Sequence, residues 1–68
     1  MKAKSAHISG GKIQFLTENN SRHKLKTSPT NDTFVQVEKM DDMFMGITDG
    51  GWAHFYNDNG DLKNSKRI

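Results

Sequence analysis

The chain has 68 residues, a formal net charge of +2 and no cysteine. This length allows one small domain, 1–68, and the lack of cysteine excludes a disulfide framework and a cysteine zinc site. The chain has neither an apolar run near the roughly 18 residues of a membrane-spanning helix nor a signal-peptide apolar segment, so we expect a cytoplasmic protein that binds no membrane.

The first half of the sequence predicts three strands separated by polar turns. Alternating side chains favour strands at about 4–8 and 12–17, joined by a pair of glycines. A weaker strand follows at 23–27, and its lysines suit the edge of a sheet. The longest loop is predicted at 28–32, because Pro29 is incompatible with a central strand.

Residues 33–45 fit two kinds of element. A strand explains the alternation of Val35 and Val37 with their neighbours. A helix would begin with Asp32 as its cap and end at Gly46, with an apolar face between them. Two β-branched valines and a pair of aspartates lower the helix propensity, so we favour strands here.

The last third predicts two hairpins in succession. Strand-forming runs at 43–48 and 52–57 are separated by an Asp-Gly turn, and a further strand can follow the Asn-Gly turn at 58–60. Both dipeptides tolerate the positive φ that short hairpin turns require. Four of the six aromatic residues lie in this region, between Phe44 and Tyr56.

These elements predict an all-β fold, a small antiparallel meander of five or six strands that resembles an SH3-like or OB-like partly open barrel. The alternative is an α+β fold with a helix at about 32–45. The basic N- and C-terminal ends are expected to fray. Turns are predicted at Gly10–Gly11, Asn19–Asn20, Asp41–Asp42, Asp49–Gly51 and Asp58–Gly60. The predicted core consists of Ile13, Phe15, Leu25, Val35, Val37, Phe44, Ile47 and Phe55.

Charge is distributed unevenly along the chain. Residues 1–31 contain six lysines and arginines but only one acid, Glu18, whereas residues 32–61 contain seven acids and only Lys39. Such asymmetry can mark the footprint of a charged partner. Turn geometry explains most of the aspartates equally well, because Asp favours turns. It does not explain the basic ends.

The chain shows no catalytic constellation. Its serines lack a G-x-S-x-G turn, and His7, His23 and His54 lack the spacing that places two ligands on one helix face. Asp41 and Asp42 are adjacent, so on an extended chain they point to opposite faces. We therefore expect no enzyme activity, no metal site and no cofactor.

The strand at 52–57 places Trp52, His54 and Tyr56 on one face, and Ala53 and Phe55 on the other. One face must supply the core. If the face with Trp52 is exposed instead, it offers an aromatic platform on which bases can stack.

Two functions fit these observations. The leading hypothesis is a non-enzymatic accessory or modulator protein, of the kind found in phages and mobile elements, that binds a larger protein partner. Its predicted contact residues are Asp41, Asp42, Met43, Phe44, Trp52, His54 and Tyr56. The alternative is a small nucleic-acid-binding β-barrel that uses its aromatic strand and basic ends. Its predicted contact residues are Lys12, Arg22, Lys24, Lys26, Lys63, Lys66 and Arg67.

Overall fold

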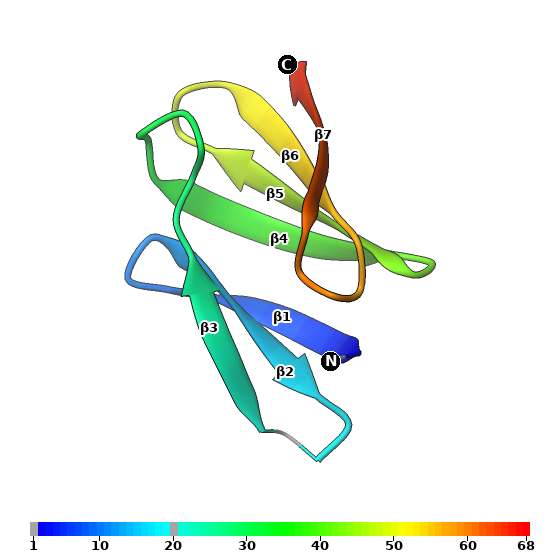
Figure 1. Ribbon diagram of the computed structural model, residues 1–68. Coiled ribbons are helices and arrows are strands. Elements are labelled where there is room, and N and C mark those ends of the chain that lie inside the picture. Colours follow the sequence, from blue (N-terminus) through cyan, green and yellow to red (C-terminus); the bar gives the residue numbers. More distant parts are fainter. Residues whose placement is uncertain (1, 20) are drawn as a thin grey trace.

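The computed structural model describes residues 2–19 and 21–68, and it gives the backbone alone at positions 23 and 24. All the regular structure in these residues is β-strand (Figure 1). The seven strands are β1 (Ala3–Ser9), β2 (Lys12–Thr17), β3 (Arg22–Lys26), β4 (Phe34–Met40), β5 (Met43–Thr48), β6 (Trp52–Tyr56) and β7 (Leu62–Arg67). The all-β prediction is confirmed, and strands β4 and β5 occupy the segment for which a helix was the alternative.

The strands form two antiparallel sheets, one in the order β1-β2-β3 and the other in the order β4-β5-β6-β7. Both sheets are meanders, since each strand pairs with its neighbour in the chain. The described residues therefore form seven strands in two sheets, where the sequence predicted five or six strands in one partly open barrel. The loop around Pro29 separates the sheets, because proline cannot donate a hydrogen bond to a ladder. This loop rises from β3 to β4 in Figure 1.

The hairpin turns follow the predicted chemistry. Gly10 and Gly11 join β1 to β2 with φ angles of 59° and 78°, and Asp41 joins β4 to β5 with a φ of 56°. The next two hairpins use Gly51 and Gly60 with φ angles of 85° and 81°. A positive φ is the reason for glycine and aspartate at these positions. The predicted turn at Asn19 continues at position 20, which lies outside the described residues.

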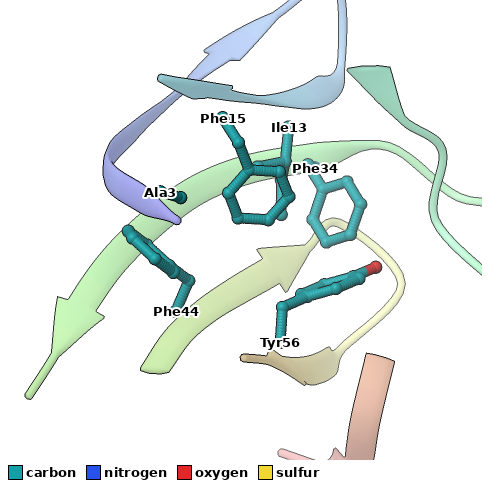
Figure 2. Packing of buried hydrophobic residues seen from close by; sticks show 6 residues of the cluster. All are labelled: Ala3, Ile13, Phe15, Phe34, Phe44 and Tyr56. Atoms are coloured by element: carbon teal, nitrogen blue, oxygen red, sulfur yellow. The ribbon is translucent and has the colours of Figure 1, made fainter. Parts of the chain in front are cut away.

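The core lies between the two sheets (Figure 2). Ile13 and Phe15 point into it from β2, and they meet Phe34, Phe44 and Tyr56 from the four-stranded sheet. The Phe15 ring packs edge-on against Phe44, with centroids 5.3 Å apart, and against Tyr56, with centroids 5.8 Å apart. Edge-to-face pairs at these distances stabilise a core beyond simple burial.

Register shifts occur in four of the strand pairs, and those in β4 and β1 change which side chains point inward. The register of β4 shifts between Phe34 and Gln36, so Val35 has no partner on β5. Phe34 is therefore buried and Val35 is 58% exposed. The prediction that Val35 is a core residue is wrong for this reason, because an extra residue reverses the alternation of faces. A similar shift occurs in β1, next to the buried Ala3.

The remaining core predictions divide into three groups. Ile13, Phe15 and Phe44 are buried as predicted, and Val37 is half-buried against the core. Leu25 is 43% exposed on β3, so its predicted burial is wrong. β3 is an edge strand, and no further described strand covers that side chain. The last two, Ile47 and Phe55, are half-buried on the face of the four-stranded sheet that points away from the core, so their assignment to the core is wrong.

Both basic ends of the chain are paired in strands, although they were expected to fray. The Ala3 amide donates to the Asp58 carbonyl at 2.7 Å, which connects β1 to the β6–β7 turn. The Ile68 amide donates to the Gly51 carbonyl at 2.9 Å. The N-terminal strand therefore bridges the two sheets.

Candidate protein-binding face

The four-stranded sheet has an inner face that packs on the core and an outer face that does not. Along β5, Phe44, Gly46 and Thr48 are buried, whereas the residues between them are only half-buried. Side chains alternate between faces along a strand. We define the outer face as Met40, Met43, Met45, Ile47, Ala53 and Phe55.

Cross-strand pairing brings the outer-face side chains together in two central rows. Met45 lies opposite Phe55, and Ile47 lies opposite Ala53. Directly opposed residues have Cβ atoms about 4.5–5.5 Å apart, so each pair is in contact. Ala53 is 5% exposed because larger neighbours surround it.

The two edge strands add polar rims to these rows. On β4, Glu38 pairs with Met45 and Gln36 pairs with Ile47. On β7, Asn64 pairs with Phe55 and Lys66 pairs with Ala53. The Gln36 amide nitrogen donates to the Glu38 carboxylate at 3.0 Å. The outer face is therefore apolar along its centre, with an acid at one edge and a lysine at the other.

The outer face is separate from the core of the domain. The half-buried residues that pack against the core are Ala6, Ile8 and Val37. Each of them lies on the face of its sheet that points toward the core, not on the outer face. The three-stranded sheet covers the inner face, where Ile13 and Phe15 meet Phe34. Within the described residues, the methionines of the outer face thus lie on a surface without a partner sheet.

A network of polar side chains joins the loop between the sheets to the four-stranded sheet. Asp32 is its centre: its Oδ1 accepts hydrogen bonds from Ser28 and from Thr30 at 2.7 Å. Its Oδ2 accepts one from the Thr48 hydroxyl at 2.7 Å. That hydroxyl in turn accepts the Trp52 amide at 3.1 Å. The network therefore fixes the loop on the β5–β6 turn.

His54 is fully buried at the other end of this network. Its Nε2 lies 3.2 Å from the Thr30 hydroxyl, and its Nδ1 lies 2.7 Å from the Ser65 hydroxyl. The Thr30 hydrogen is directed at Asp32, so Thr30 accepts from a protonated Nε2 and Ser65 donates to Nδ1. A neutral imidazole satisfies both bonds.

The environment shifts the pKa of both titratable groups in the network. Burial lowers the pKa of His54 below its usual value of 6.5, and the charge of Asp32 opposes this shift. Burial alone would raise the pKa of Asp32, but hydrogen bonds from the three hydroxyl groups outweigh it and lower the pKa to about 2. The fold thus favours a neutral imidazole and a charged carboxylate.

The structure places the predicted protein-contact residues in different environments. Asp41 and Asp42 are exposed in the β4–β5 turn, and Met43 is half-buried on the outer face. Trp52 is half-buried at the start of β6. The other three predicted contact residues are buried inner-face residues, so their assignment to an exposed surface is wrong: Phe44, His54 and Tyr56.

The same burial removes the aromatic platform of the nucleic-acid hypothesis. His54 and Tyr56 lie beneath the four-stranded sheet, because that face of β6 supplies the core. Trp52 already stacks on His54, with centroids 6.0 Å apart, and the Arg67 guanidinium lies 5.4 Å above its ring.

The predicted nucleic-acid contacts lie on separate parts of the domain. Lys12 and Lys26 lie at one end of the three-stranded sheet, and Arg22 lies at its other end. Lys63, Lys66 and Arg67 are exposed on β7 of the other sheet. The side chain of Lys24 is outside the described part of the structure.

Sequence reasoning did not identify the outer face as a unit, nor the network around Asp32. The alternation of Met43, Met45 and Ile47 along one strand was the available signal for the face. For the network, the signal was the run of hydroxyl residues preceding Asp32 in a loop.

Comparison with protein families, with curated proteins and with solved structures gave no match. The described residues form no helix that is long and apolar enough to cross a membrane. The described residues form a small all-β domain with two antiparallel sheets.

Proposed function

We propose that this chain is a non-enzymatic binding protein that contacts a protein partner through the outer face of its four-stranded sheet. The observation that supports this proposal is an apolar centre on the outer face, built from the pairs Met45–Phe55 and Ile47–Ala53, that does not pack against the domain core. Contiguous apolar surface with a polar rim is typical of protein interaction sites.

The chemistry of the face supports a protein partner. Methionine is flexible and polarisable, so it adapts to an apolar surface of a different shape. Met40, Met43 and Met45 lie on neighbouring positions of β4 and β5. The aspartates at 41 and 42 extend an acidic rim from Glu38 to the end of the hairpin.

The proposal retains part of the leading hypothesis and changes its surface. Asp41, Asp42 and Met43 remain at the proposed contact, whereas the buried aromatics are replaced by Met45, Ile47 and Phe55. The acidic rim also argues against a phosphate backbone on this face, because like charges repel.

The test compares two lysine substitutions in the full chain. Met45→Lys places a charge in the centre of the outer face, where its stem can still cover the sheet. Val35→Lys places the same charge at the exposed bulge outside the central rows. Circular dichroism should show that both variants fold.

Protein association is then measured in two ways, as capture of proteins from native lysate and as self-association of the pure chain. Met45→Lys should reduce association about tenfold or more, as expected for the centre of an interface, and Val35→Lys should not. Equal behaviour of the two variants in both measurements would overturn the proposal.

The nucleic-acid alternative has its own measurement. Electrostatic binding should weaken with salt at a log–log slope of about −0.9 per phosphate contacted on duplex and about −0.7 on single strands. Retention on nucleic acid that is lost in a Lys63→Glu, Lys66→Glu double variant, with Met45→Lys unaffected, would favour the alternative.

A further inference from the structure

We infer that the outer face binds a second copy of this chain, in a two-fold symmetric pair whose axis runs parallel to the strands. The inference rests on the proposed function and specifies its partner. It follows from the order of the four strands and from the charges on the two edge strands.

Beside its central rows, the outer face carries opposite charges on its two edge strands. Glu38 lies on β4 at one edge of the sheet, and Lys66 lies on β7 at the other edge. β5 and β6 lie between β4 and β7 in the order of the sheet. A two-fold axis parallel to the strands, between two outer faces, places β4 of each copy over β7 of the other. The dimer then contains two acid–lysine contacts related by symmetry.

A second possible axis is disfavoured by the same charges. A two-fold axis across the strands places β4 over β4 of the second copy and β7 over β7. Glu38 then approaches the other Glu38, and Lys66 approaches the other Lys66. Like-charge contacts oppose association, so the charges select the axis parallel to the strands.

We call the residues that pair across neighbouring strands one level. A two-fold axis parallel to the strands moves each residue over a different strand at the same level, so the central rows of the two copies also fit each other. Met45 of one copy lies over Phe55 of the other, since these two residues share one level. Ile47 lies over Ala53, which shares the next level. The first contact places a thioether against an aromatic ring, and the second places a large side chain over a small one, as close packing requires.

The rim contact fits the reach of the side chains. Cross-strand pairing places Lys66 at the same level as Ile47 and Gln36. Glu38 lies on β4 at the neighbouring level. The side-chain nitrogen of Gln36, a residue paired at the same level as Lys66, donates to the Glu38 carboxylate at 3.0 Å, so the carboxylate lies within hydrogen-bond distance of a side chain from that level. A lysine side chain from the second copy can therefore meet that carboxylate.

The size of the face predicts weak association. Four strands at about 4.8 Å spacing and five or six residues at about 3.3 Å give a face of roughly 19 by 18 Å. Two such faces cover about 700 Å² in total, which is below the roughly 1,000 Å² of a specific stable interface and is typical of weak, transient contacts. The dimer should therefore form in the micromolar to millimolar range.

The experiment is sedimentation equilibrium of the pure full chain at concentrations from about 10 μM to about 1 mM. The average mass should rise from the monomer value of 7.7 kDa toward twice that value. Glu38→Lys and Lys66→Glu should each weaken association about tenfold, because each creates two like-charge contacts. The double variant Glu38→Lys, Lys66→Glu should restore it, and so should an equimolar mixture of the two single variants.

A chain that stays monomeric at the highest concentration overturns the inference. If Met45→Lys still reduces capture of another protein, the proposed function stands with a different partner. If Met45→Lys also leaves the capture of other proteins unchanged, the inference and the proposed function both fail. A dimer that ignores all the charge reversals contradicts the symmetry, and the inference fails in that case as well.

Discussion

Gly46 shows how closely the two sheets approach each other. It lies on the inner face of β5, and a Cβ atom added there would lie 2.5 Å from Cε1 of Phe34 and 2.6 Å from Cδ1 of Ile13. We predict that Gly46→Ala lowers the free energy of unfolding by about 1–3 kcal/mol, because the packed rings must move. Urea denaturation measures this. Ser9→Ala, an exposed strand substitution, is the control and should change stability by less than about 0.5 kcal/mol; equal stability of the two variants would contradict the packing.

The pKa shifts of two residues in the polar network determine how the free energy of unfolding depends on pH. For His54, folding lowers the pKa below 6.5, so protons bind more readily to the unfolded chain. The free energy of unfolding should therefore be insensitive to His54 above pH 6.5, and should fall as the pH decreases below it. For Asp32, folding lowers the pKa from 3.8 to about 2. Its contribution is present above pH 3.8 and should be lost as the pH falls from there toward 2.

Urea denaturation at a series of pH values checks these signs. His54→Gln should remove the loss that begins near pH 6.5, and Asp32→Asn should remove the loss between pH 3.8 and 2. A His7→Gln variant, altered at an exposed position, is the control for the histidine effect. If the free energy of unfolding rises as the pH falls below 6.5, the assignment of His54 as a buried neutral imidazole is wrong.

At the scale of elements, the loop between the sheets depends on a few hydroxyl groups. Thr48 is 4% exposed and uses its hydroxyl twice, toward Asp32 and toward the Trp52 amide. We predict that Thr48→Val costs about 1–2 kcal/mol, because it removes both hydrogen bonds while preserving shape. Amide exchange at residues 28–33 should accelerate. The matched control, Thr27→Val at an exposed position, should leave this exchange unchanged, and equal exchange in both variants would show that Thr48 does not hold the loop.

The strands and turns were predictable from the sequence, but the faces of several strands were not. Turn chemistry at Gly10, Asp41 and Gly60 is local, so single residues placed the hairpins correctly. The bulge in β4 is not local, since it depends on pairing with β5. One extra residue buried Phe34 and exposed Val35, which reversed the predicted phase at the start of that strand, whereas Val37 beyond the bulge faces the core as predicted.

The candidate site was predicted only in part for a related reason. On β6, alternation grouped Trp52, His54 and Tyr56 correctly, but it left open which group faced the core. The structure settles this through Phe15, which reaches Tyr56 from the other sheet. Contacts between residues so far apart in sequence leave no periodic signal. The same is true of the network that links Asp32 to Thr48.

At the scale of the whole molecule, Phe15 connects the two sheets. It is fully buried and contacts both Phe44 and Tyr56. We predict that Phe15→Ala costs about 3–5 kcal/mol. A 68-residue domain has about 3–10 kcal/mol of stability in total, so a large part of the population should unfold at ambient temperature. Thermal unfolding followed by circular dichroism measures this. Val35→Ala is the control, and its melting curve should match the parent; a Phe15→Ala curve that also matches would place the core elsewhere.

The central claim is that two copies of this chain associate through the outer face of the four-stranded sheet. Methyl NMR of the pure chain, labelled at methionine and isoleucine, tests this most directly when the protein concentration is raised. The methyl signals of Met43, Met45 and Ile47 should shift or broaden with concentration, whereas that of the buried Ile13 should not. Constant signals at these three methyl groups, or changes confined to Ile13, would contradict the claim.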